Sequence, residues 1–231
     1  MKHLNKKFVV IICLAVIVIG IYLLAKPHGF DTYVSDTNFK FAETEGGIVL
    51  TDYLGENESL IIPDEIDGKK VIALNGTFCT DSKIKNVRIP EGVRSIDYMT
   101  FWHCISLEKI EMPDSMVSIG NAAFEGCISL KKVKMGKNVK EILPYAFRAC
   151  YLLERAELND GLEFIGENAF ADCVKLRSCN IPASVRVIGG VSGKSIECQT
   201  GSTEGSSFTG CEKLALSVDV NNQWYYGKEI R

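Results

Sequence analysis

The chain has too few histidines for the commonest catalytic and metal-binding arrangements. Only three occur in 231 residues: His3 and His28 flank an apolar N-terminal run, and His103 stands alone in the rest of the sequence. A glycine-rich phosphate loop, a nucleophile-elbow motif and a recurrent carboxylate pair are also missing. Cys104, Cys127, Cys150 and Cys173 recur 23 residues apart, unlike the short paired spacing of zinc ligands. We therefore predict no catalytic residues, no metal site and no cofactor.

The chain also lacks a strong charge of either sign. Its formal net charge is −3, whereas a nucleic-acid-binding domain is normally strongly basic. A hydrophobic content of 46% is ample for a buried core. The composition predicts an ordinary folded domain that does not bind nucleic acid.

One long apolar run lies near the N-terminus. Residues 8–25 carry no charge, and Lys2, Lys6 and Lys7 precede them. A helix of that length spans about 27 Å, close to the hydrocarbon thickness of a bilayer. A cleaved signal peptide has a shorter apolar core of about 7–15 residues and a small-residue cleavage site, which is not evident here. We predict a cytoplasmic segment over 1–7, a single transmembrane signal-anchor over 8–25 and an extracellular remainder; cleavage would instead give a secreted protein.

A fixed repeat dominates the rest of the chain. Phenylalanine recurs every 23 residues and then once more after a longer gap: Phe78, Phe101, Phe124, Phe147, Phe170 and Phe208. Apolar residues keep the same register in every unit, and each unit closes on an alternating pair such as Ile110 with Met112. Self-similarity of this kind predicts a solenoid of stacked coils. We expect one short strand per coil, stacked into a parallel sheet, opposite a turn with a short helical or 3₁₀ segment.

Cysteine follows most of these phenylalanines by three places. Equivalent positions point the same way from successive coils, and parallel side-chain vectors suit a disulfide poorly. We therefore expect buried free thiols that act as small hydrophobic side chains, with Cys198 reactive in a loop. The residues concerned are Cys104, Cys127, Cys150, Cys173 and Cys211.

The pattern Ala-Phe-x-x-Cys-x-x-Leu-x-x-Ile-x-Ile-Pro, with Val-x-x-Ile-Gly between units, resembles the BspA-like, or Treponema-type, leucine-rich repeat. The resemblance covers roughly residues 46–226. It implies an α/β-type leucine-rich repeat solenoid, strand-rich, on secreted or surface-anchored proteins that are commonly bacterial and linked to adhesion and protein binding. Members share no catalytic residues, so the resemblance implies no enzyme.

The expected domain order follows from these patterns. A linker over 26–38 leads to an N-terminal cap and first strand over 39–77, then to the array over 78–226 and a tail over 227–231. A loop rich in Gly, Ser and Thr, 190–207, interrupts the array. It is either a tolerated insertion or a ligand-contacting loop.

Two surfaces are candidates for binding. The first is the concave face of the sheet, where outward strand positions are mostly charged; it is either a solvated face that neutralises itself or a site for a polar protein or glycan. The second is an aromatic turn that either forms a partner-binding patch or packs under the cap. The candidate residues are Arg88, Lys109, Glu111, Lys132, Lys134, Arg155 and Glu157 on the strands, with Tyr98, Trp102 and His103 on the turn.

The sequence therefore predicts a membrane-anchored extracellular module that binds a protein or glycan at the cell surface. The alternative is a structural component of the cell envelope whose repeats assemble with other copies.

Overall fold

The computed structural model describes residues 32–34, 38–79, 83–189, 207–211, 213–218, 224–225 and 228–229. The predicted signal-anchor over 8–25 and nearly all of the predicted loop over 190–207, Cys198 included, lie outside these residues. No helix in the described part of the chain is long and apolar enough to cross a bilayer.

A β-rich cap precedes the repeats. Its strands are β1 (Thr32–Val34), β2 (Phe39–Thr44), β3 (Gly47–Tyr53), β4 (Ser59–Ile61), β5 (Glu65–Ile66) and β6 (Lys69–Thr77). β1, β2 and β3 pair antiparallel, and β3 then pairs parallel with β6. Phe39 and Phe41 alternate with exposed or half-buried neighbours and are themselves buried, so one face of the β2–β3 hairpin closes the apolar end of the first coil.

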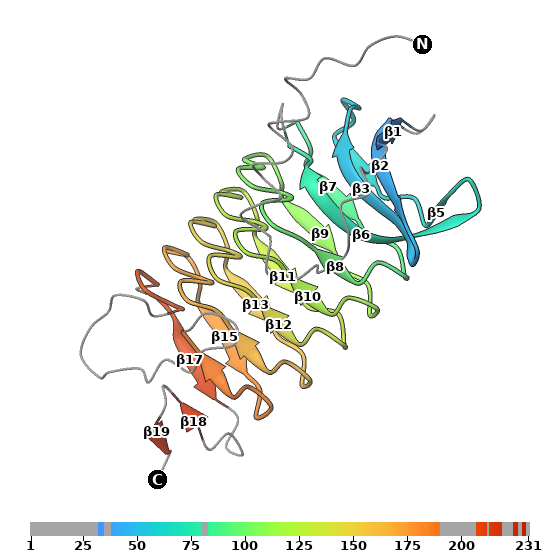
Figure 1. Cartoon of the computed structure of the whole chain (residues 1–231). Helices are drawn as coiled ribbons and strands as arrows, with labels where there is room; N and C mark the ends of the chain where they lie inside the picture. The colour runs from blue at the N-terminus through green and yellow to red at the C-terminus, as the bar shows by residue number, and fades with distance from the viewer. Residues whose placement is uncertain are drawn as a thin grey trace, which may run out of the picture. The chain divides into compact units, whose positions relative to one another are not determined.

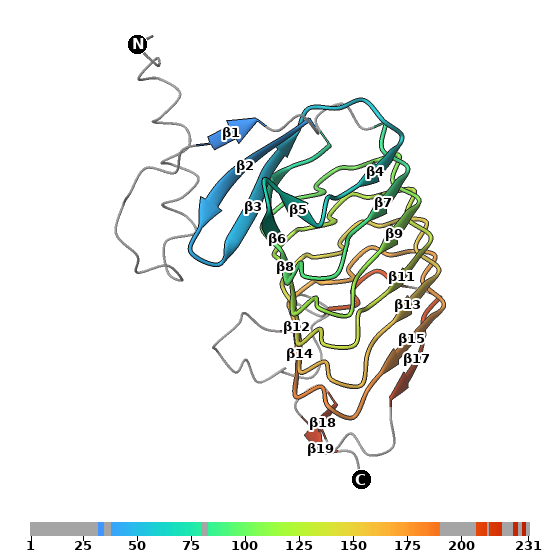
Figure 2. The same ribbon diagram turned by 90° about the vertical axis from the view of Figure 1, so that its right-hand side faces the viewer.

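Each repeat then contributes one coil, and the coils stack on top of one another (Figure 1). One side carries strands of three or four residues: β7 (Asn86–Arg88), β9 (Lys109–Glu111), β11 (Lys132–Lys134), β13 (Arg155–Glu157), β15 (Ser178–Ile181) and β17 (Ala215–Val218). A second side carries strands of two residues: β8 (Ser95–Ile96), β10 (Ser118–Ile119), β12 (Glu141–Ile142), β14 (Phe164–Ile165) and β16 (Val187–Ile188). Both rows are visible edge-on in Figure 2. β18 (Trp224–Tyr225) and β19 (Lys228–Glu229) form a separate antiparallel pair.

The second row of strands was not predicted. It runs parallel from β6 through β16 in a single sheet; Leu74 of β6 pairs with Ile96, and from β8 onward the isoleucines pair in register, such as Ile96 with Ile119. Two residues are too short a stretch for an alternating pattern to be recognised in the sequence. The row doubles the number of parallel ladders that hold neighbouring coils together.

The helical or 3₁₀ turn was predicted wrongly, because the described residues contain no helix. The turns at Phe101, Phe124, Phe147 and Phe170 instead have a left-handed residue two places before and two places after the phenylalanine, as at Ala122 (φ 53°) and Gly126 (φ 73°). Right-handed helix cannot continue through such residues. The turns hydrogen-bond between coils instead: the Phe101 N–H donates to the Ala123 carbonyl at 2.8 Å, and the same bond recurs in the following coils.

The core is a column of phenylalanine rings. Phe101, Phe124, Phe147 and Phe170 are fully buried. From Phe101 to Phe208 successive rings lie nearly parallel, with interplanar angles of 2–8° and centroids 5.1–5.3 Å apart. Because these rings occupy equivalent positions, their separation is the repeat distance between coils.

Beside the rings, the cysteine thiols bond to the backbone. The Cys127 thiol donates to the Phe101 carbonyl at 3.1 Å. Cys150, Cys173 and Cys211 make the equivalent bond, each in its own successive coil. The prediction of free buried thiols is confirmed for Cys127, Cys150 and Cys173. Burial raises the pKa of these thiols, which keeps them protonated and able to donate.

The same prediction is wrong for Cys104, which forms a disulfide with Cys79. The argument against ladder disulfides assumed equivalent positions in neighbouring coils. Cys79, however, follows Phe78 by one place, whereas Cys104 follows Phe101 by three. The two side chains therefore do not run parallel, and their Cα atoms are 5.2 Å apart, within the ordinary range for a disulfide.

A half-buried carboxyl in the first coil gives the fold a predicted pH dependence. Asp97 stands where Gly120, Gly166 and Gly189 stand in other coils, and burial raises its pKa despite a hydrogen bond from Ser95. Because the pKa of Asp97 is higher in the folded state than in the unfolded chain, the free energy of unfolding falls as the pH rises from the unfolded-state pKa, about 3.9, through the folded-state pKa. We expect Asp97→Asn to be more stable than the wild type in urea unfolding at pH 7 but not at pH 3.

The exposed Asp160 provides the control, because Asp160→Asn should change stability little at either pH. A loss of stability in Asp97→Asn at pH 7 would show that the carboxylate is stabilising and contradict the prediction.

Candidate functional site

The strand face is the row of outward-pointing side chains on β7, β9, β11, β13 and β15. Each of these strands begins with an exposed, a buried and an exposed residue, so the middle residue packs inward and its neighbours meet solvent. The pairing register places Asn86 beside Lys109 and Lys132 beside Arg155. Figure 2 shows these strands following one another along one side of the stack. All seven strand residues predicted from the sequence lie on this face.

Two strands of the face carry internal ion pairs. Lys109 Nζ lies 2.6 Å from Glu111 Oε1, and Arg155 Nε lies 3.1 Å from Glu157 Oε1. The pairs thus form mainly within a strand, at positions i and i+2. One contact crosses between coils, where Arg88 Nε lies 3.9 Å from Glu111. Lys109, and more weakly Arg88, hold the pKa of the Glu111 carboxyl below its usual value.

The middle strand, β11, differs from its neighbours. It carries Lys132 and Lys134, both exposed, and among the described residues neither forms an ion pair within 4.0 Å. The parallel ladder is also interrupted here: one sheet ends at β9 and the next begins at β11, although the two strands lie side by side. Lys131, the third lysine of the run, pairs instead with Glu108 at 2.8 Å.

The charge of the face follows from these residues. It presents five cationic side chains and two anionic ones on a chain whose net charge is −3. Because each carboxylate is already paired with a cation of its own strand, three positive charges remain: Lys132 and Lys134, which have no ion pair among the described residues, and Arg88, which reaches the paired Glu111 only at 3.9 Å. The face therefore does not neutralise itself.

A shallow groove of about 290 Å³ lies at the cap end of the same face. Its floor includes Ile61 of β4, whose exposed fraction of 67% is unusually high for a large apolar side chain. Arg88, Lys109 and Glu111 line its edge. The sequence analysis missed Ile61, although Leu60-Ile61-Ile62-Pro63 repeats the strand-then-proline pattern of Val87-Arg88-Ile89-Pro90.

The aromatic turn is partly solvent-exposed. Tyr98 is 44% exposed and Trp102 is 40% exposed, so the cap does not cover them. The His103 ring packs against the Trp102 ring with centroids 4.1 Å apart, and the imidazole also lies over Gly126. The structure thus brings Trp102 and His103 together. They lie on the turn, between β8 and β9, and not on the strand face.

No group of three or more potential metal ligands occurs among the described residues. The buried cysteines are spaced along the stack and donate to backbone carbonyls. The described surface offers charged groups, hydrogen-bonding groups and exposed apolar side chains to a binding partner.

Comparisons with known proteins agree with this architecture. The model of the family described as "BspA type Leucine rich repeat region" matches residues 74–195 with six copies. The solved structure of a Leucine Rich Repeat protein from T. pallidum aligns with a TM-score of 0.68 and 27% identity, covering 79% of this chain and 80% of that chain. No curated protein matches the chain.

Two further solved structures share the fold. A leucine rich cell surface protein from Faecalibacterium prausnitzii A2-165 aligns with a TM-score of 0.56 and 21% identity, over 84% of this chain. A leucine-rich repeat protein from Bacteroides ovatus ATCC 8483 aligns with a TM-score of 0.53 and 23% identity, over 85% of this chain. The chain spans 56% and 55% of the lengths of these two proteins.

Proposed function

The chain belongs to the BspA-type leucine-rich repeat family, and from that premise we propose that it is a surface-exposed binding module whose strand face recognises an acidic segment of a partner protein. The observation that carries the proposal is the pair of unpaired lysines, Lys132 and Lys134, at the centre of a cationic face. Long-range attraction to such a face speeds encounter with an acidic partner and suppresses binding of basic ones.

The fold suits this role. Parallel ladders on two sides of each coil hold the outward side chains at fixed spacing, so little side-chain order remains to be imposed on binding. The groove beside Ile61 adds an apolar contact next to the charges. Polar recognition with a nearby apolar anchor is the usual composition of a protein-binding surface.

The proposed location is outside the cell, attached to the membrane by residues 8–25. The uncharged run in the sequence supports the attachment. The Cys79–Cys104 disulfide supports export, because such bonds persist in oxidising compartments. The cell-surface description of the Faecalibacterium protein agrees with this placement, although the resemblance to it is one of fold.

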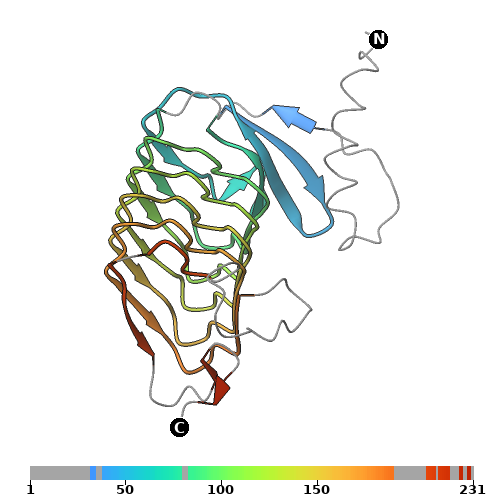
Figure 3. The same ribbon diagram turned by 90° about the vertical axis from the view of Figure 1, so that its left-hand side faces the viewer.

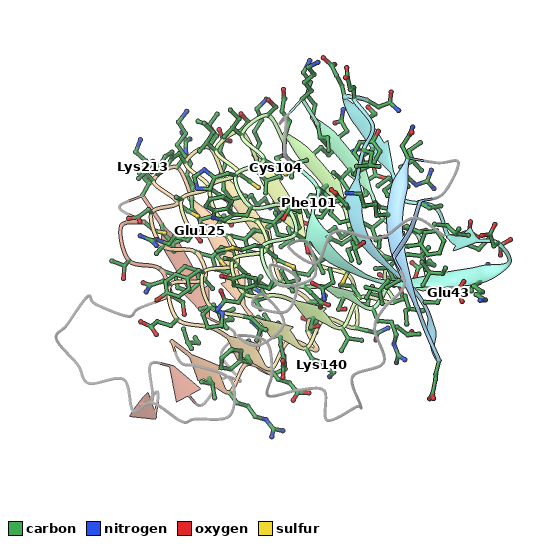
Figure 4. All side chains as sticks on the ribbon, turned by 45° about the horizontal axis from the view of Figure 1, so that its top comes forward. Glu43, Phe101, Cys104, Glu125, Lys140 and Lys213 are labelled. Carbon is green, nitrogen blue, oxygen red and sulfur yellow. A yellow bond between two sulfur atoms is a disulfide. The ribbon has the colours of Figure 1, made fainter. Side chains whose placement is uncertain are left out.

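The test compares two charge reversals of equal size in the full-length chain. Lys132→Glu with Lys134→Glu is expected to weaken binding of a fluorescent 12-residue glutamate-rich peptide about tenfold or more, and to flatten the dependence of affinity on ionic strength. Lys175→Glu with Lys213→Glu is the matched control, because these lysines are exposed and occupy equivalent positions in adjacent coils. Figure 4 labels Lys213. The control should bind nearly as well as the wild type.

Equal losses in the two double variants would show that net charge alone governs binding and would reject the strand face as the site. Trp102→Ala tests the aromatic turn, the second predicted surface. We expect this variant to bind the peptide as well as the wild type does. A loss of binding free energy of about 2 kcal/mol or more at unchanged melting temperature would instead place the site at the aromatic turn. Preference for a sulfated oligosaccharide over the peptide at the same charge density would assign the face to a glycan.

A further inference from the structure

An exposed apolar row runs along the corner that joins the phenylalanine turns to the strand face. Its members are the residues four places after each phenylalanine, one from each of four successive coils. They are 44%, 36%, 47% and 41% exposed, in the order Ile105, Ile128, Tyr151 and Val174. We call these four residues the corner stripe. The row is continuous in the repeat because all four positions are equivalent.

Large apolar side chains at solvent are common singly, but a continuous row of four is not. Four side chains exposed to this degree offer an apolar area on the order of 300 Å², the size at which patches on monomeric proteins are often functional. The stripe makes no contribution to the proposed cationic site. An exposed apolar row of this size therefore suggests a second binding surface with a partner of its own.

The backbone at the corner holds the stripe in place. The N–H of each of Ile105, Ile128 and Val174 donates to the carbonyl two residues earlier, at 2.7–2.9 Å. The same local turn gives these three side chains the same orientation, and Tyr151 occupies the equivalent position in the remaining coil. A partner therefore meets a preformed ridge and need not order it.

The spacing of the ridge selects the secondary structure of the partner. Equivalent positions recur every 5.1–5.3 Å, as the phenylalanine rings show. The apolar positions of an amphipathic helix recur on average every 3.5 residues, or about 5.3 Å along its axis. Alternate side chains of a strand recur about every 6.7 Å. Over three intervals a helix with apolar positions at i and i+11 departs from this spacing by about 1 Å, whereas a strand departs by about 4–5 Å, nearly one whole coil.

Charges on both sides of the stripe are already paired. Three residues before Ile128 along the coil, Glu125 lies 3.3 Å from Arg148, which also lies 3.8 Å from Asp172. Three residues after Ile128, Lys131 pairs with Glu108. The apolar ridge thus has borders of mixed sign, which suit the polar flanks of an amphipathic helix better than a lipid surface of one charge.

We propose that the corner stripe is a docking ridge for an amphipathic α-helix of a partner protein, lying along the stack across four coils. Figure 3 shows the coils from the side opposite to that of Figure 2, with one turn above the next along the direction such a helix would follow. The helix would present apolar residues at positions i, i+4, i+7 and i+11, about three turns in all. This site is independent of the cationic strand face.

The test uses two 15-residue peptides of identical composition and the full-length chain. A stapled helix with leucines at positions 1, 5, 8 and 12 is the probe, and a peptide with leucines at positions 1, 3, 5 and 7 is the strand-like control. We expect the helix to bind and the strand-like peptide to bind at least tenfold more weakly. Ile128→Ser with Tyr151→Ser should weaken helix binding at least tenfold, whereas Leu54→Ser, at an exposed leucine outside both proposed sites, should not.

Melting temperature of each variant establishes that it is folded, and Tyr151→Asp serves if the double variant is not. Absence of helix binding, equal binding of both peptides, or unchanged binding in the stripe variants would overturn the proposal. A concentration-dependent dimer of the wild-type chain, seen by sedimentation and lost in the stripe variants, would overturn it in favour of self-association. Because these substitutions leave Lys132 and Lys134 intact, failure here does not bear on the proposed acidic-segment site.

Discussion

Replacing Phe124 by alanine is expected to lower the free energy of unfolding by about 3–5 kcal/mol, the cost of removing a large aromatic side chain from a packed core. The ring is fully buried, and it stacks on Phe101 at 5.2 Å and on Phe147 at 5.1 Å. Because the ring lies between the rings of the two neighbouring coils, those coils cannot close the gap without breaking their ladders. Urea unfolding of the full-length chain measures the change.

Phe208→Ala is the matched comparison at the end of the column. That ring stacks on Phe170 and is 7% exposed, so its removal should cost less. Nearest-neighbour coupling in a solenoid also makes a break in the middle worse than one at an end. Equal costs for the two variants, or an unchanged midpoint for Phe124→Ala, would contradict the picture of a continuous stacked column.

The repeat is the part of the fold that sequence predicts best. Phe124 recurs with a fixed period because each coil must present the same side chain to the coils above and below it. The buried columns and the row of longer strands follow directly from that constraint. The family match confirms the repeat type.

Turn geometry was harder to predict because it depends on backbone dihedral angles that many residues can adopt. Gly126 is a recognisable left-handed residue, but His103, Ala149 and Asp172 hold the same position with φ of 54–60°. The alanines nearby favour a helix locally, yet hydrogen bonds between coils outweigh that preference. The intrinsic helix propensity of these residues is therefore a weaker effect here than the hydrogen bonds that repeat between coils.

The candidate site was partly predictable for a similar reason. Alternation identifies which strand residues face outward, so Lys132 and Lys134 could be placed on one surface. Alternation does not say which cation pairs with which carboxylate, because that depends on side-chain reach: Lys109, for example, pairs with Glu111 of its own strand. The corner stripe was not predicted from the sequence, because Ile105 and Ile128 lie in a turn segment. In a turn, no periodicity distinguishes exposed apolar residues from buried ones.

The Cys79–Cys104 disulfide gives the second large predicted effect. It closes a loop of 25 residues between the cap and the first coil, which corresponds to a stabilisation of about 3 kcal/mol by the loss of unfolded-chain entropy. Cys79→Ala is expected to lower the melting temperature by about 5–10 °C in this size class. The variant leaves Cys104 in its place beside the phenylalanine column, so packing is disturbed at the cap alone.

Reductant supplies the control for that experiment. It should lower the melting temperature of the wild-type chain by a similar amount and leave Cys79→Ala unchanged. Thiol labelling of the folded chain should modify Cys79 and Cys104 only after reduction, while Cys127, Cys150 and Cys173 stay unmodified, because burial raises the pKa of their thiols and excludes reagent. Two results would contradict this prediction: labelling of Cys79 without reductant, or an unchanged melting temperature of the wild-type chain in reductant. Either result would mean that the disulfide does not stabilise the contact between the cap and the repeats. The proposal that the chain is exported would then lose the support of the disulfide.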